Sequence, residues 1–116
     1  MSKFLSFDSG LGALSYAFHC PGCNSSHVVR YYGGSFQWVI SGVEKDAPTV
    51  APSILVNGNK RNPNEPVCHS YVKEGKIIYL SDCTHAMVGQ TVELPDIEMT
   101  ESYKYYRMNI KQKDEQ

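Results

Sequence analysis

The segment CHSYVKEGKIIYLSDCTH, residues 68–85, holds two runs of β-favouring residues separated by a short turn at Gly75. A glycine in this place supplies the left-handed position of a type I turn, so the segment predicts a β-hairpin. Cys68 begins the first strand of this hairpin, whereas Cys83 and His85 follow the second. The hairpin therefore places these three metal-binding side chain types together, at the end away from the turn.

A second pair of thiols stands earlier, in HCPGCNSSH, residues 19–27. Cys20 and Cys23 flank a Pro-Gly step, in which proline fixes one dihedral angle and glycine permits the chain to reverse. Such a turn presents two thiolates to one ion, as in a zinc knuckle. The residues that follow favour a strand rather than a helix, which argues against a thioredoxin-like redox motif. The pattern predicts that Cys20 and Cys23 are metal ligands.

The remaining two ligand places have four candidates, which are Cys68, His69, Cys83 and His85. Neighbouring residues in a strand point to opposite faces, so Cys68 and His69 are not expected to bind one ion together. Two ligand sets are ordinary for structural zinc. One is all-cysteine, and the other replaces Cys83 with His85. We interpret His19 and His27 as residues at strand edges or beside the site rather than as ligands.

Length and composition define the broad class of the protein. The chain has 116 residues, 41% hydrophobic and 20% charged, which is typical of one globular domain. A net charge of −1 argues against a protein that binds nucleic acid through its phosphates. We find no apolar run long enough to cross a membrane and no convincing signal peptide, so we expect a cytoplasmic protein. Thiols stay reduced there, which favours metal ligation over disulfides.

The pattern along the chain predicts a small, mostly β domain over residues 1–97, with a polar appendage at residues 98–116. We expect one sheet of about five to seven short strands around a zinc-ribbon-like Cys/His site, with at most short helical turns. Beyond the 68–85 hairpin, the predicted strands are 14–19, 27–32, 35–40, 53–57 and 90–95. Gly33 and Gly34 suggest a hairpin between the second and third of these, and residues 44–53 and 58–66 are predicted loops.

Three motifs, FHCPGC, APTVAPSILVNG and CHSYVKEGKIIYLSDCTHAMVGQTVELPDI, together resemble a family of short phage and bacterial proteins of uncharacterised function. Its members often carry the label "ammonia monooxygenase", which the residues do not support, because the chain has no membrane span and no copper-like ligand set. The resemblance covers about residues 16–97. It implies a phage-encoded protein, and some relatives occur beside genes for ubiquitin-like conjugation. The family's Cys-Pro-x-Cys, Cys-His and Asp-x-x-His steps match Cys20, Cys23, Cys68, His69, Asp82 and His85. Serine often replaces Cys83 in this family, which favours His85 as the fourth ligand.

These observations lead us to expect a protein with one zinc ion that acts as a non-enzymatic binding module on a host or phage protein in the host cytosol. A complete set of four ligands leaves zinc no open position for water. The first alternative is a metal-dependent hydrolase, in which Asp82 or His69 acts as general base on a metal-bound water. The second is a zinc ribbon that binds nucleic acid, against which the charge balance argues. The oligomeric state stays open.

Overall fold

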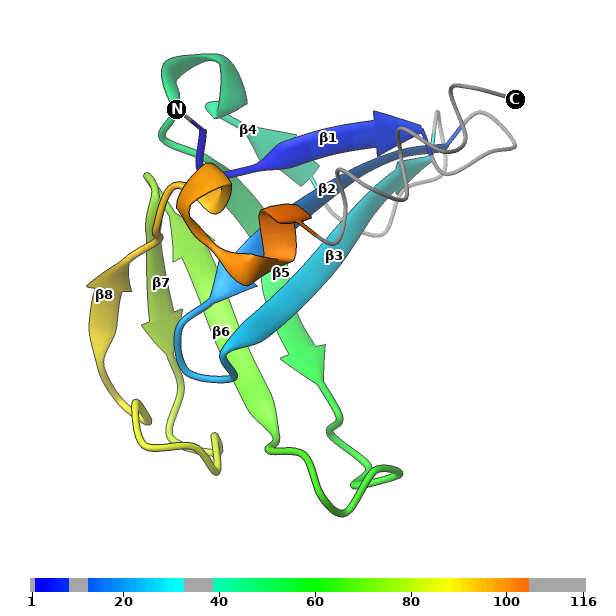
Figure 1. The fold of residues 1–116 in the computed structure, drawn as a ribbon. Helices are drawn as coiled ribbons and strands as arrows, with labels where there is room; N and C mark the ends of the chain where they lie inside the picture. The colour runs from blue at the N-terminus through cyan, green and yellow to red at the C-terminus, as the bar shows by residue number, and fades with distance from the viewer. Residues whose placement is uncertain (1, 9–12, 33–38, 105–116) are drawn as a thin grey trace.

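The computed structural model describes residues 2–8, 13–32 and 39–104, and within these ranges the chain forms eight strands in two antiparallel sheets (Figure 1). The first sheet has the order β1 (Leu5–Asp8), β2 (Ala13–Cys20) and β3 (Ser25–Tyr32). The second sheet has the order β4 (Val39–Ser41), β5 (Thr49–Val56), β6 (Cys68–Lys73), β7 (Lys76–Tyr79) and β8 (Thr91–Glu93). The helical elements in these ranges are short: the 3-10 turns η1 (Val43–Lys45) and η2 (Ile97–Met99), and the α-helical residues 101–104. The mostly β fold class is confirmed, although the strands form two sheets rather than one.

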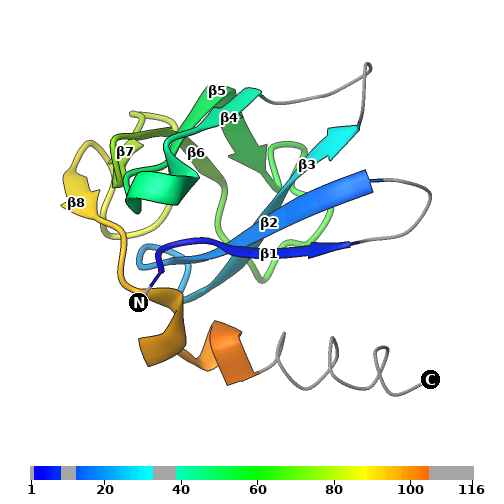
Figure 2. The same ribbon diagram turned by 90° about the horizontal axis from the view of Figure 1, so that it is seen from above.

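The two sheets share one hydrophobic core. Figure 2 shows the three-stranded sheet lying along one side of the five-stranded sheet. Phe18 and Val29 from the first sheet belong to the same buried cluster as Val72, Ile77 and Tyr79 from the second. Alternate residues of β6 point into this cluster, as the period of two of a half-buried strand requires. The inward face of β6 is therefore buried between the sheets, and its outward face is available for chemistry.

The predicted hairpin over residues 68–85 is confirmed, because β6 pairs with β7 from Ser70–Tyr79 to Lys73–Lys76. Its turn type differs from the prediction. Glu74 and Gly75 both have positive φ, 51° and 80°, as in a type I′ turn. A type I′ turn matches the right-handed twist of the flanking strands better than a type I turn does.

Other local predictions were wrong for tertiary reasons. In the described part of the predicted hairpin over residues 27–40, β3 pairs with β2 and β4 pairs with β5, rather than with each other. Its turn, at Gly33 and Gly34, lies outside the described residues. Strand β5 begins at Thr49, inside the predicted loop 44–53, although it contains Pro52. The pairing of β5 with β6 shifts register between Val50 and Ile54, and this irregularity accommodates the proline.

The segment after β8 packs on the first sheet as far as it is described. Ile97 is fully buried, and its amide donates a hydrogen bond to the carbonyl of Ser2 at 2.7 Å. The Oγ atom of the buried Ser102 lies 2.8 Å from Nδ1 of His19 in β2. The division of the chain at residue 97 stays a prediction. Within residues 2–8, 13–32 and 39–104, no helix is long and apolar enough to cross a membrane.

Candidate active site and metal centre

Strand β6 carries two clusters of reactive side chains on its two faces. Cys68 points into the core and is fully buried, whereas the side chain of His69 is 25% exposed on the outward face. This separation is the one that strand alternation predicts for neighbouring residues. The two clusters are therefore adjacent in sequence but distinct in space.

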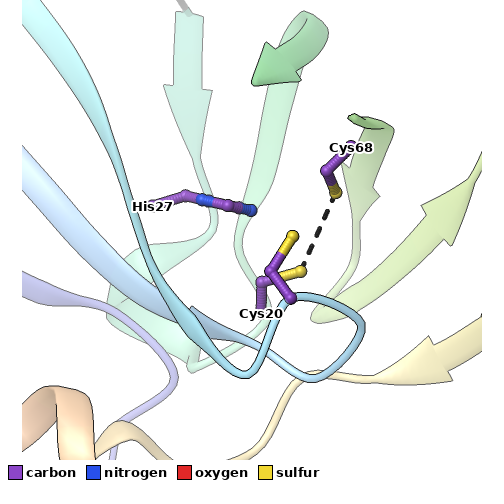
Figure 3. Close-up of side chains that lie close together, drawn as sticks. Cys20, His27 and Cys68 are labelled. Carbon is purple, nitrogen blue, oxygen red and sulfur yellow. Dashed lines mark hydrogen bonds between the residues drawn. The ribbon is translucent and has the colours of Figure 1, made fainter. Parts of the chain in front are cut away.

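The inward cluster brings together three of the predicted ligands and one histidine. Ligand atoms of Cys20, Cys23, His27 and Cys68 all lie within 4.8 Å of one another, so this group could hold a metal ion. The Sγ atoms of Cys20 and Cys68 are 3.8 Å apart, although they belong to different sheets. Figure 3 shows the ring of His27 directed toward these two thiols. The Cys-Pro-Gly-Cys turn joins β2 to β3 and so provides Cys20 and Cys23 from one short connection.

His27 fits a metal ligand better than an ordinary core residue. Its side chain is on the inward face of β3, only 6% exposed, with its ring edge against Phe18 at a centroid distance of 5.6 Å. Among the described residues, Nε2 of His27 has no hydrogen-bond partner. A buried nitrogen without a partner is costly, whereas a metal ion at this place would satisfy it. The chemistry of the donor set agrees, since three thiolates and one imidazole are a common ligand set for structural zinc.

The thiols lie so close together that the ionisation of each one affects the pKa of the others. The thiols of Cys23 and Cys68 donate hydrogen bonds to the Cys20 thiolate, which lowers the pKa of Cys20. The same hydrogen bonds favour the protonated forms of the donors, so they raise the pKa of Cys68 and raise that of Cys23 to about 12. A divalent cation removes this competition, because it stabilises all of the thiolates together.

Tyr79 supports the cluster from the core, a role that the sequence did not reveal. Its hydroxyl accepts a hydrogen bond from the amide of Gly22 at 2.9 Å and lies 3.1 Å from Sγ of Cys20. Burial raises the pKa of Tyr79, with a further contribution from the nearby Cys20 thiolate. The neutral phenol thus fixes the turn that carries the first two thiols.

His85, the predicted fourth ligand, lies in a second, overlapping group with Cys68 and Cys83. Its Nε2 is 3.4 Å from Sγ of Cys68, and its ring packs edge-on against Tyr79 at a centroid distance of 4.6 Å. A Cβ atom at Gly22 would lie 2.7 Å from both ring nitrogens of His85, so the imidazole closely covers the knuckle. Cys68 thus belongs to both candidate metal groups, one with His27 and one with His85.

The outward cluster is a Ser–His–Asp arrangement. Nε2 of His69 lies 3.0 Å from Oγ of Ser53, and Nδ1 lies 2.9 Å from Oδ2 of Asp82. The second carboxylate oxygen is 3.1 Å from the same Nδ1. A carboxylate only accepts hydrogen bonds, so the neutral imidazole carries its proton on Nδ1 and accepts the Ser53 hydroxyl proton at Nε2. This is the geometry in which a histidine activates a serine nucleophile.

Ser53 owes its orientation to the irregular part of β5. The register shift between Val50 and Ile54 surrounds Pro52 and Ser53, and bulges of this kind re-aim side chains beside active sites. The sequence prediction missed Ser53, because no Gly-x-Ser-x-Gly motif marks it and the residue falls where a predicted loop meets a predicted strand. The usable signal was a proline followed by a serine within an otherwise apolar, β-favouring run.

The site thus defines a candidate serine hydrolase, and comparison with known families agrees. The family model described as "Bacterial ubiquitination-like system serine protease (BubE)" matches residues 4–80, more than half of the chain, so the chain belongs to this family. Ser53 and His69 lie within the matched residues, and Asp82 lies just beyond them. Neither the curated proteins nor the solved structures contain a significant match.

Family membership corrects the expected function. The prediction of a non-enzymatic binding module was wrong, because the family is one of serine proteases. That prediction assumed that chemistry would depend on an open position at the metal, whereas the candidate catalytic residues lie on the other face of β6. His69 was considered as a candidate metal ligand, and His69 and Asp82 as general bases for a metal-bound water, but neither was assigned to a serine nucleophile. The family description supports neither a phage origin nor the label "ammonia monooxygenase".

Proposed function

We propose that the protein is a serine protease that cleaves a polypeptide substrate of a bacterial ubiquitination-like system, with Ser53 as nucleophile, His69 as general base and Asp82 as orienting carboxylate. The observation that carries this proposal is the pair of hydrogen bonds made by the two ring nitrogens of His69. Each bond is within the range expected for a nucleophile–base–carboxylate relay. The expected protein partner is, on this proposal, the substrate.

The distances assign each residue a step. Oγ of Ser53 attacks the scissile carbonyl carbon while its proton passes to Nε2 of His69. The imidazolium then gives this proton to the departing amine, and an ester joins the substrate's acyl group to Ser53. Water attacks this ester and gives a proton to His69, which returns it to Oγ as the acid product leaves. Asp82 keeps the imidazole in the required tautomer and stabilises its charged form.

A fluorophosphonate probe tests this assignment, because it reacts with an activated serine and needs no known substrate. We expect the parent protein to be labelled and Ser53→Ala to lose labelling. In His69→Ala the labelling rate should fall at least a hundredfold, because a general base typically contributes a factor of about 10²–10⁴ to the rate. Ser70→Ala is the matched control. Ser70 neighbours His69, but its buried hydroxyl has no hydrogen-bond partner among the described residues. Equal labelling of Ser53→Ala and the parent would refute the proposal.

For the inward cluster we propose one structural zinc ion bound by Cys20, Cys23, His27 and Cys68. Four protein ligands leave no position for a reacting water, so zinc contributes to folding rather than to the bond-breaking step. The orphaned nitrogen of His27 and the mutual hydrogen bonds of the thiols support this ligand set.

Chelation under reducing conditions tests the structural role. Structural zinc in small domains contributes about 10 kcal/mol or more of apparent binding energy, part of which is folding energy. We expect a strong chelator to lower the melting temperature and to change the circular dichroism spectrum, and expect added zinc to restore both. A zinc-free protein with an unchanged spectrum and melting temperature would contradict a structural role.

A further inference from the structure

Both backbone polar groups of His69 are bonded to one side chain, the thiol of Cys83. The amide of His69 donates to Sγ of Cys83 at 3.2 Å, and the thiol of Cys83 donates to the carbonyl of His69 at 3.1 Å. Cys83 is only 7% exposed, so water does not compete strongly for either bond. Asp82, the carboxylate that contacts the imidazole of the same histidine, is the residue immediately before it.

The thiol bonds the amide of His69 on the side of β7, where regular pairing has ended, and on that side the carbonyl of His69 also accepts a hydrogen bond from the amide of Leu80 at 2.9 Å. Pairing of β6 with β7 ends at the Ser70–Tyr79 pair, so it stops one residue short of His69. Beyond Tyr79 the chain turns, with the amide of Cys83 bonded to the carbonyl of Leu80 at 3.3 Å. The amide of His69 would therefore lack a partner if Cys83 had no polar side chain. The same thiol fixes the position of the turn that carries Asp82.

We propose that Cys83 is a positioning residue of the catalytic triad, which holds Asp82 at hydrogen-bonding distance from His69, and that it is not a metal ligand. This inference rests on the proposed function of Ser53. The contact with the His69 carbonyl requires a thiol that keeps its proton, whereas zinc binds a thiolate, which has no proton to donate. The geometry thus favours the triad over the alternative metal group of Cys68, Cys83 and His85.

Three variants test the proposal through the kinetics of fluorophosphonate labelling. In Cys83→Ala we expect the maximal labelling rate to fall at least tenfold, with the concentration for half-maximal rate changed less than twofold. Cys83→Ser keeps one donor and one acceptor, and we expect it to retain labelling within about threefold of the parent. In an Asp82→Asn background, Cys83→Ala should cause little further loss, because residues that act through one another are not additive.

The outcomes separate this inference from the proposed function. Loss of zinc in Cys83→Ala or Cys83→Ser would overturn the positioning role and make Cys83 a ligand. Parent-like labelling of Cys83→Ala, or additive losses in the double variant, would also overturn it. Labelling that persists in Ser53→Ala would instead refute the proposed protease site itself. A correctly folded Cys83→Ala, shown by an unchanged circular dichroism spectrum, confines the effect to the triad.

A separate observation concerns the surface around the triad. Leu55 is 55% exposed and lies opposite His69 in the register of β5 and β6, and Tyr71 is 45% exposed on the same outward face two residues beyond His69. Two large apolar side chains thus flank the Ser53–His69 pair. We infer that they bind apolar side chains of the substrate polypeptide next to the scissile bond, since both are exposed apolar side chains on the face that carries His69.

Two fluorophosphonates with different tails test this surface without a known substrate. We expect a probe with an alkyl tail to label the parent about tenfold faster than one with a polyethylene glycol tail, a ratio typical of a modest apolar subsite. Leu55→Ser and Tyr71→Ser should each reduce the ratio of the alkyl-probe rate to the glycol-probe rate. Met99→Ser is the control, because Met99 is equally apolar and more exposed, but belongs to η2. Equal rates for both probes, or a preference that survives both substitutions, would refute the subsite.

Discussion

Replacing His27 with leucine should change the stability of the fold in opposite directions, depending on whether the inward cluster holds a metal ion. Leucine is close to histidine in size and has no polar atom. Without an ion, Nε2 of His27 is a buried nitrogen that has no partner among the described residues, and such a group costs about 1–3 kcal/mol. Its removal should then stabilise the fold, less any cost of repacking against Phe18.

With zinc bound, the same substitution removes a ligand. If the dissociation constant for zinc rises about a hundredfold, the stabilisation from binding falls by about 2.7 kcal/mol. A change of 1 kcal/mol shifts the melting temperature of a domain of this size by about 4–8 °C. We therefore expect His27→Leu to melt about 10 °C or more below the parent in the presence of zinc, and expect the difference to vanish or reverse in a chelator.

The assay is thermal melting of both proteins with zinc and with a chelator, under reducing conditions, alongside the measured zinc content. His85→Ala is the essential comparison, because the sequence favoured His85 as the fourth ligand. A zinc-loaded His27→Leu that melts above the parent would refute our assignment of His27. A drop of the expected size in His85→Ala, with full zinc retention in His27→Leu, would transfer the ligand role to His85.

Asp82→Asn should slow labelling of the active serine by a factor of about 10²–10³. This is less than the factor of roughly 10⁴ for a buried triad aspartate, because water screens a carboxylate that is 57% exposed. An unchanged labelling rate would exclude Asp82 from the triad. Gly75→Ala and Gly89→Ala should each destabilise the fold by about 1 kcal/mol in chemical denaturation, since both glycines have left-handed φ. Gly75 should cost more, because its new Cβ would lie 3.1 Å from the Lys3 side chain, whereas nothing lies within 4 Å at Gly89. Tyr79→Phe removes a hydroxyl that supports the metal knuckle and should weaken zinc binding about tenfold, as measured by competition with a chelating dye.

Local signals were enough to predict the hairpin of β6 and β7 and the meeting of Cys20, Cys23 and Cys68. A tight turn and a Cys-Pro-Gly-Cys step each determine geometry over a few residues, so the sequence contains the whole cause. The role of Ser53 depends instead on its register against a distant strand. Nothing within a few residues of Ser53 indicates that His69 will lie 3.0 Å from its hydroxyl.

The place of His27 depended on a relation between strands that the sequence contained only indirectly. In the hairpin of β2 and β3, His27 pairs with Phe18, and Cys20 pairs with Ser25. Residues 18, 20, 25 and 27 therefore share one face of the sheet, because side chains alternate along each strand and match across it. Knowledge that β2 and β3 pair directly through the Cys-Pro-Gly-Cys turn would have placed His27 beside the thiols.

The outward cluster depends on the inward cluster, but the inward cluster does not depend on the outward one. Zinc at Cys68 would fix the inward face of β6 to the knuckle between β2 and β3, and so fix the strand that presents His69 outward. Removal of zinc should therefore abolish labelling of Ser53 together with the folded spectrum. Ser53→Ala should abolish labelling while zinc content and melting temperature stay at parent values, because Ser53 is a half-buried residue of the outward face. Loss of zinc in Ser53→Ala, or active-serine labelling in a zinc-free protein, would contradict this order of dependence.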